Sequence, residues 1–510
     1  MKLFAAIDVG SYELAMKIFE VSGKGVLREV DHIRKRIELG TDTYNTGKIS
    51  EERVDELCNA LSEFKRIAKG YRVNDIKVYG TSAIRETKNT LIVLEQIKLR
   101  TGLEVEVLSN SEQRFLHYKA VASKGKKFDD FIAKGSVIVD IGGGSIQLSI
   151  FDSGKLVTTQ NIRLGILRIR EILADLAPKT TDYVSLVEEL IDNHFHTFHE
   201  HYLNNVSINN IIVVDDYISY IIQKAFQGDV VKVSEYKKFI KEIKEEQPAL
   251  VARKYGLSEE YASLLIPSAI LLRKLTKLTK AESIWAPGVS LADGIAYEYG
   301  EKEKLIKNQH DFEEDIISCA KSVALRYQSN TERCALIERI AMTLFDSTKR
   351  LHGMGKRERL LLRIAAILSD CGKYMSLEDG AECSYVIIMA TEMIGLSHAE
   401  REIVANVVKF NKTHFEYYDA LAKQSVMEKE TYLTMSKLTA IFRIADGVCR
   451  SYRTKVNDIR VTLKDNELVI NVDCDDNIIL EKGFFARKAR FFEEAFSVKP
   501  VLVHKKKVRG

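Results

Sequence analysis

The sequence predicts an α/β protein of two related halves, followed by an all-α domain and a small α+β C-terminal end. Strand and helix patterns alternate over the first 300 residues. Two similar stretches, "FAAIDVGSYELAMKIFEVSG" and "SVIVDIGGGSIQLSIFDSG", lie about 130 residues apart, and each gives an apolar strand, an Asp, a glycine turn and a second strand. Beyond residue 312 nearly every segment has the apolar spacing of a helix.

The two halves are predicted to follow one pattern, a β-hairpin and then alternating helices and strands. In the first half we expect strands over 3–11 and 14–22, a helix over 49–71 capped by Ser50, a strand and loop over 75–87, a helix over 91–102, a strand over 103–109 and a helix over 111–123. After the second hairpin we expect a helix over 183–198, a strand over 209–216, a helix over 261–279 and a strand over 283–287.

The C-terminal part reads differently. Residues 458–474 alternate strictly and predict a hairpin that turns at "DNE", and residues 481–496 predict a closing helix. We expect four domains, with the charged segment 297–311 as a linker, at residues 1–125, 126–300, 312–455 and 456–510.

The charge is nearly balanced, with 76 basic and 72 acidic residues and a net charge of +4. Composition therefore gives no case for nucleic acid or membrane as a partner, and no stretch is apolar enough to span a bilayer. Seven scattered cysteines without a C-x-x-C pair predict reduced thiols and a cytoplasmic setting. The basic tail "HKKKVRG" is either a solvated terminus or a contact for a polyanion.

Both glycine turns have the features of a phosphate site. A glycine-rich turn after a buried strand can point backbone N–H groups at an anion, although a plain tight turn gives the same pattern. Asp8 and Asp140 come just before the two turns and are candidate ligands for a divalent cation. The segment "GTSAIRET" (80–87) adds hydroxyl groups and Arg85, which could clamp phosphate oxygens.

In this order, "AAIDVGS", "GTSAIRET", "SNSEQ", "VIVDIGGGS" and "RLGILRIRE" resemble the exopolyphosphatase / guanosine pentaphosphate phosphohydrolase (Ppx/GppA) family. The resemblance covers residues 3–300. It implies two ribonuclease-H-like halves of the actin, Hsc70 and sugar-kinase superfamily, and the helical region resembles the HD-like part of longer members. It also implies a phosphoanhydride hydrolase that releases terminal phosphate from inorganic polyphosphate or guanosine pentaphosphate, a Mg²⁺ cofactor and a homodimer.

The resemblance carries site residues over one by one. The implied metal ligands are Asp8 and Asp140, and the implied catalytic positions are Glu112, Gln113 and Asp140. The implied phosphate-binding residues are Gly10, Ser11, Thr81, Ser82, Arg85, Gly142, Gly143, Gly144 and Ser145.

Several positions depart from the family pattern. The catalytic glutamate is Gln113, which cannot take a proton from water; a register shifted by one would make Glu112 the base, although neighbouring helix residues point about 100° apart. A second carboxylate is Gln147. Four other departures are Tyr12 for an asparagine, Ile146 for a threonine, Ala292 for an arginine, and Asp215 and Asp216 in place of a glycine turn.

These departures leave two functions open. One is a weak hydrolase. The other is a non-catalytic polyphosphate or (p)ppGpp-type nucleotide binder, acting as a sensor. A sugar or acetate kinase is less favoured, because no separate sugar-binding set is present.

The HD-like positions are also altered. Cys334 stands at the first histidine, Ser369 and Asp370 at the His-Asp pair, and Asp446 is retained. We expect His352, His398 and His414 to be surface or loop residues, and the domain to be structural or regulatory, because two acids alone do not complete a metal site.

Overall fold

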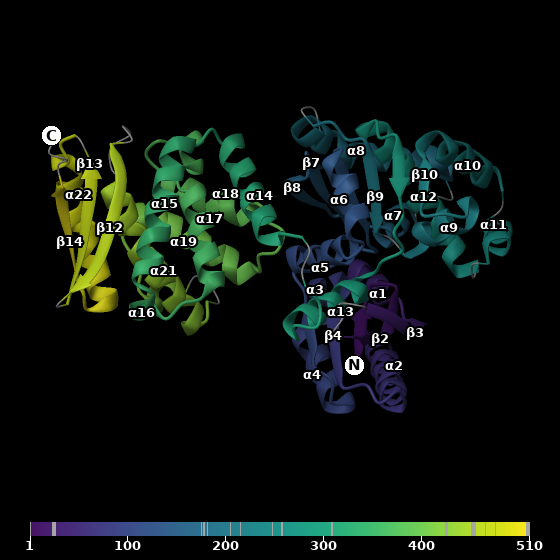
Figure 1. The fold of residues 1–510 in the computed structure, drawn as a ribbon. Coiled ribbons are helices and arrows are strands. Elements are labelled where there is room, and N and C mark those ends of the chain that lie inside the picture. Colours follow the sequence, from purple (N-terminus) through teal and green to yellow (C-terminus); the bar gives the residue numbers. More distant parts are fainter. Residues whose placement is uncertain are drawn as a thin grey trace. The chain divides into compact units, whose positions relative to one another are not determined.

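The computed structural model describes residues 2–505 except 23–26, 175, 177–178, 181, 204–205, 215, 247, 257–258, 308–309, 424–426, 450–454, 465 and 475. The chain divides into two compact units, Met1–Phe312 and Glu313–Gly510 (Figure 1). The finer domain limits at 125/126 and 455/456 stay predictions.

The first sheet has the strand order β3-β2-β1-β4-β5. The strands β1 (Lys2–Val9), β2 (Glu13–Val21) and β3 (Leu27–Arg36) are antiparallel neighbours, and β4 (Asp75–Gly80) and β5 (Val105–Val107) add in parallel. The helices of this half are α1 (Leu39–Asn45), α2 (Glu51–Gly70), α3 (Ser82–Glu86), α4 (Thr90–Thr101) and α5 (Asn110–Ala122).

The second sheet has the order β10-β11-β9-β6-β7-β8. Its strands are β6 (Ser136–Ile141), β7 (Ile146–Asp152), β8 (Lys155–Ile162), β9 (Asn210–Val214), β10 (Val230–Lys232) and β11 (Ser283–Trp285). The helices of this half are α6 (Lys126–Ala133), α7 (Ile166–Leu173), α8 (Tyr183–Phe198), α9 (Asp216–Phe226), α10 (Val233–Glu245), α11 (Pro248–Tyr255), α12 (Glu259–Thr279) and α13 (Leu291–Lys302).

The internal repeat is visible in these two orders. Read from its hairpin edge, the second sheet runs β8-β7-β6-β9-β11 and the first runs β3-β2-β1-β4-β5. Asp8 and Asp140 occupy matching places near the ends of β1 and β6. Each sheet contributes to its own cluster of buried apolar residues. The predicted pair of α/β halves is confirmed.

Some details of this unit were predicted wrongly. The segment 297–311 is not all linker, because residues 297–302 complete α13. Part of the "GTSAIRET" loop is the short helix α3. Ser50 occupies the N-cap of α2, but its hydroxyl donates to Asp42 and makes no capping bond to the helix.

The second unit joins a helical domain to a three-stranded sheet. Its helices are α14 (Phe312–Arg326), α15 (Thr331–Ser347), α16 (Lys349–His352), α17 (Lys356–Ile367), α18 (Gly380–Ala390), α19 (His398–Lys412), α20 (Tyr418–Leu421), α21 (Lys429–Val448) and α22 (Ile479–Phe496). The predicted hairpin is β12 (Val456–Lys464) and β13 (Glu467–Cys474), and α22 is the predicted closing helix. An unpredicted strand, β14 (Lys499–Lys505), pairs in parallel with β13, so the tail is ordered through Lys505 and its remainder lies outside the described residues.

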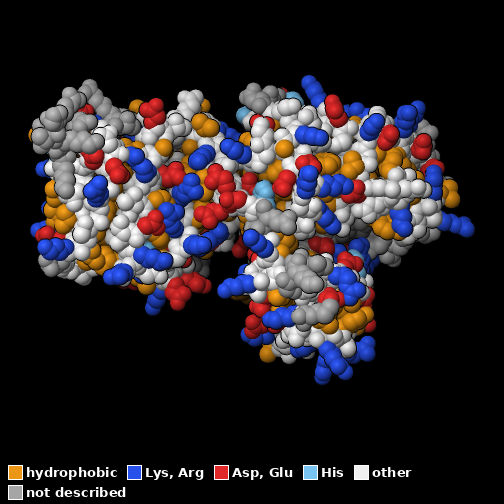
Figure 2. Space-filling view, in the orientation of Figure 1, with side chains coloured by type: hydrophobic (Ala, Val, Ile, Leu, Met, Phe, Trp, Pro, Cys, Tyr) orange, Lys and Arg blue, Asp and Glu red, His pale blue; other side chains and the backbone are white. Residues whose placement is uncertain are grey.

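Surface charge is mixed. Figure 2 shows Lys and Arg side chains interspersed with Asp and Glu on the drawn face of each unit, as the near-balanced composition predicts. None of the helices in the described part of the chain is long and apolar enough to cross a membrane. All seven cysteines belong to the described residues and are free thiols.

Candidate active site

A cavity of about 120 Å³ lies between the two glycine turns of the first unit. Both halves contribute to its wall. The predicted site residues that line it are Asp8, Gly10, Ser11, Thr81, Ser82, Gln113, Asp140, Gly142 and Gly143. Four predicted residues are not among its lining residues, namely Arg85, Glu112, Gly144 and Ser145.

The glycines of the turns are explained by close contacts within the protein. A Cβ on Gly10 would lie 2.7 Å from the carbonyl oxygen of Glu13, and Gly10 N–H donates to that same oxygen at 3.1 Å. A Cβ on Gly144 would lie 2.2 Å from the hydroxyl of Tyr44, and one on Gly143 would lie 3.1 Å from Cβ of Ser11. The second turn therefore needs glycine because the first half packs directly against it.

Three hydroxyl groups from the first half meet at this contact. Ser11 Oγ lies 2.9 Å from the Tyr44 hydroxyl and 2.8 Å from Ser82 Oγ, and Tyr44 donates to Ser82 at 3.1 Å. Burial raises the pKa of the Tyr44 hydroxyl, so it stays a neutral donor. Ser11 and Ser82 also line the cavity, so this cluster provides neutral hydrogen-bond donors at its wall.

The start of α5 separates the roles of its two adjacent acid and amide residues. The Glu112 carboxylate accepts from Ser109 N–H at 2.9 Å, and Ser109 Oγ accepts from Glu112 N–H at 3.3 Å, which forms a capping box. Gln113 instead lines the cavity. Arg85 donates to Leu108 O at 2.6 Å and to Asn110 Oδ1 at 2.5 Å, so its guanidinium supports the start of this helix.

A histidine that the sequence analysis did not select lies in the cavity wall. Nδ1 of His117 lies 2.5 Å from Oδ2 of Asp140, and the two side chains are 9% and 8% exposed. His117 follows Gln113 by four residues on α5, which places both on one helix face. That spacing was the available signal, but the partner carboxylate comes from the other half of the unit.

The wall of the cavity is acidic. Asp8, Glu13 and Asp140 line it, and none of its described lining residues is Lys or Arg. Carboxylate oxygens suit Mg²⁺, which proteins usually hold through one or two carboxylates together with substrate phosphates and water. No group of three or more His, Cys, Asp or Glu positioned for a metal occurs among the described residues, so a cation here would need ligands from the substrate and water.

The remaining altered positions are also placed. Tyr12 lines the cavity and is 5% exposed, with Arg36 over its ring at 5.3 Å. Ile146 and Ala292 are buried. Asp215 and the side chain of Asp216 lie outside the described residues.

The Ppx/GppA phosphatase family model matches residues 18–303, which is more than half of the chain, and the model of Ppx/GppA phosphatase domain III matches residues 317–485. The chain belongs to the Ppx/GppA phosphatase family. This confirms the resemblance, while the loss of the catalytic carboxylates stays a prediction.

Relatives in the Ppx/GppA family have two kinds of name. A guanosine-5'-triphosphate,3'-diphosphate pyrophosphatase of Photobacterium profundum is 21% identical over 478 residues, covering 92% of this chain and 91% of that protein. Exopolyphosphatase 1 of Mycobacterium tuberculosis is 27% identical over 173 residues, covering 34% of this chain and 49% of that protein.

Solved structures support the fold. An Aquifex aeolicus member of the Ppx/GppA family matches with a TM-score of 0.50 and 22% identity, covering 61% of this chain and 99% of that chain. An exopolyphosphatase from Cytophaga hutchinsonii matches with a TM-score of 0.51 and 18% identity, covering 60% and 100%. The predicted actin-like α/β class, with helical domain III and a small C-terminal sheet, is confirmed.

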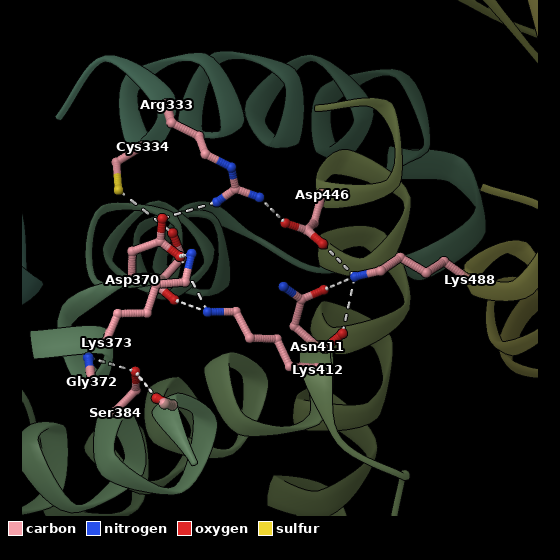
Figure 3. Close-up of polar contacts among 12 residues, drawn as sticks. Arg333, Cys334, Asp370, Gly372, Lys373, Ser384, Asn411, Lys412, Asp446 and Lys488 are labelled. Carbon is pink, nitrogen blue, oxygen red and sulfur yellow. Dashed lines mark hydrogen bonds and ion pairs between the residues drawn. The ribbon is translucent and has the colours of Figure 1, made fainter. Parts of the chain in front are cut away.

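In domain III the altered HD-like positions come together as an ion-pair cluster (Figure 3). Arg333 lies between the two acids, 3.2 Å from Asp370 Oδ2 and 2.6 Å from Asp446 Oδ1. Lys488 of α22 also pairs with Asp446. Cys334 Sγ lies 3.6 Å from Ser369 Oγ.

These cations stand where a metal would be needed to pair the acids. Burial acts to raise the pKa of Asp446, but attraction to Lys488 and Arg333 outweighs it and holds the pKa well below its ordinary range. Lys412 and Lys373 pair with Asp370 at 3.1 and 2.9 Å. The side chains of domain III therefore neutralise both acids with their own cations.

His352 does not follow the prediction for this domain. It is 3% exposed, its Nε2 lies 2.9 Å from Phe345 O, and its Nδ1 accepts from Met354 N–H at 2.9 Å. Burial lowers the pKa of His352. His352 is thus a buried structural residue, whereas His398 and His414 are exposed as predicted.

Proposed function

We propose that the cavity binds the end of a phosphate chain and that the protein hydrolyses the terminal phosphoanhydride slowly. The observation that carries this proposal is the placement of Gln113 in the cavity wall while Glu112 is held in the capping box of α5. An amide can orient water but cannot accept its proton, and loss of a general base typically costs about 10²–10⁴-fold in rate.

We assign the cation to Asp8 rather than to Asp140, because Oδ2 of Asp140 is bonded to His117. A polyanion beside three carboxylates is repelled unless a cation intervenes. Mg²⁺, when bound, would neutralise phosphate charge and so assist displacement.

The chain's own groups would hold the phosphate oxygens. We assign this role to the hydroxyls of Ser11, Thr81 and Ser82 and to the backbone of Gly142 and Gly143, all of which line the cavity. The names of the relatives make polyphosphate and a guanosine pentaphosphate the two candidate substrates. Arg85 remains a candidate clamp that would first have to leave the start of α5.

A second candidate function is a non-catalytic sensor of the same ligands. It is favoured by the contact of Tyr44 and Ser82 with the second glycine turn, because a ligand that widens this contact would move one half against the other.

One experiment separates these functions. The purified full chain is incubated with Mg²⁺ and either medium-length polyphosphate or guanosine pentaphosphate, and phosphate release is followed beside equilibrium binding. Slow release above the protein-free rate supports the hydrolase. Tight binding without release supports the sensor, and neither binding nor release contradicts both.

A further inference from the structure

We propose that His117 accepts the proton of the attacking water, in place of the carboxylate that Gln113 cannot supply. This inference rests on the proposed hydrolysis in the same cavity. It assigns a catalytic role to a residue that lies outside the motifs of the sequence.

The position of His117 fits this role. Gln113 and His117 are four residues apart on α5 and both line the cavity. A proton acceptor at either position would therefore face the same volume. Glu112, the neighbouring acid, is held by Ser109 at the start of the helix.

Asp140 holds the ring of His117 in place. The 2.5 Å contact joins His117 Nδ1 to Asp140 Oδ2, and both side chains are buried. Because a carboxylate can only accept, Nδ1 carries the hydrogen of this bond, and the lone pair of the neutral ring is on Nε2. A base oriented by a third group is the arrangement that activates weak nucleophiles in many enzymes.

The proposed step is balanced. The oxygen of water forms a bond to the terminal phosphorus, and the bridging P–O bond to the next phosphate breaks. One proton of the water passes to Nε2 of His117, and the shortened chain leaves with the electron pair of the broken bond. The imidazolium, stabilised by Asp140, then returns its proton to solvent.

The competing explanation is that His117 only pairs with Asp140 and keeps the halves in register. The His117→Asn variant separates the two, because its amide N–H₂ replaces the Nδ1 donor to Asp140 while Nε2 is removed. A purely structural His117 predicts that His117→Asn retains activity.

The test uses four full-length proteins: wild type, His117→Asn, Gln113→Glu and the double variant. Phosphate release from polyphosphate with Mg²⁺ gives kcat for each, and fluorescence of Trp285, the single Trp, checks that the first unit is folded. We expect His117→Asn to lower kcat about 10²-fold in wild type, the usual size of a general-base effect. In the Gln113→Glu background the same change should have little effect, since the carboxylate then serves as base.

The other outcomes overturn the inference in distinguishable ways. Equal kcat for wild type and His117→Asn, or an equal loss in both backgrounds, excludes His117 as the proton acceptor while leaving the proposed hydrolysis intact. If wild type is silent and Gln113→Glu releases phosphate, the site binds the phosphate chain but His117 is no base. If both are silent, the proposed hydrolysis fails as well.

Discussion

Arg114 donates from Nε to Oε1 of Gln147 at 3.2 Å, and this buried hydrogen bond joins α5 of the first half to β7 of the second. Gln147 lies directly across the β6–β7 pair from Asp140. The amide that replaces the family's carboxylate is therefore integrated into the contact between the halves.

Gln147→Leu should destabilise the first unit by about 1–3 kcal/mol, because it removes the buried acceptor of Arg114. Urea unfolding followed by Trp285 fluorescence measures this, since Trp285 is fully buried in β11. Gln147→Glu is the matched control. It offers Arg114 a charged acceptor of the same length, and we expect its unfolding midpoint to stay close to that of wild type. A Gln147→Leu protein as stable as wild type would show that the bond contributes nothing.

Glu112 and Gln113 should respond oppositely to exchange of acid and amide. Glu112→Gln should leave phosphate release nearly unchanged, because its carboxylate caps α5. Gln113→Glu should raise release by about 10²-fold or more, because it puts a proton acceptor in the cavity wall.

Steady-state phosphate release of the two single variants checks this. Glu112→Ala serves as a stability control and should cost about 1 kcal/mol through the lost capping interaction. A large loss of release in Glu112→Gln, with no gain in Gln113→Glu, would show that the register is shifted and that Glu112 is the base.

The fold could largely be predicted because its strongest signals are local. The hairpin of β1 and β2 and the hairpin of β12 and β13 follow from apolar alternation around turns. β3 escaped prediction because "LREVDHIRKR" is charged and mostly exposed, so pairing with β2 makes it a strand. β14 was missed for a similar reason, since its parallel pairing with β13 is not a sequence pattern.

The site was predictable only in part, because its contacts come from distant segments. The glycine turns and their aspartates form motifs along the chain, and many of them line the cavity. The approach of His117 to Asp140 and of Tyr44 to Gly144 depends on how the two halves pack. In domain III, Arg333 was overlooked beside Cys334, because only the folded chain brings its guanidinium between Asp370 and Asp446.

Gly144→Ala should weaken binding of the phosphate chain by separating the halves. Its Cβ would lie 2.2 Å from the Tyr44 hydroxyl and 3.0 Å from Ser82 Oγ, so both must move. Gly70→Ala is the matched control, because no atom within 4 Å would meet its Cβ. Binding of polyphosphate in the presence of Mg²⁺ measures the effect. Unchanged affinity of Gly144→Ala would mean that the contact between Tyr44 and the second turn has no part in binding.

Arg333 should be essential for domain III, because it pairs with two buried acids, Asp370 and Asp446. Removing one partner of a buried ion pair typically costs about 3–5 kcal/mol, so Arg333→Met should destabilise the second unit strongly. Thermal unfolding followed by far-UV circular dichroism would shift, whereas the Trp285 fluorescence transition, which reports on the first unit, would not. A shift of both transitions would contradict an effect confined to domain III.

The same cluster predicts how the second unit responds to acid. The pKa of Asp446 is lowered in the folded chain, so its contribution to stability is fully present above the ordinary pKa of an aspartate, near 4. As the pH falls below that value, the unfolded chain takes up a proton that the folded chain resists, and stability is lost. The circular dichroism midpoint of wild type should therefore fall between about pH 5 and pH 3. Asp446→Asn should be less stable at neutral pH and should lose part of this acid dependence. Parallel pH profiles for the two proteins would show that Asp446 is not coupled to folding.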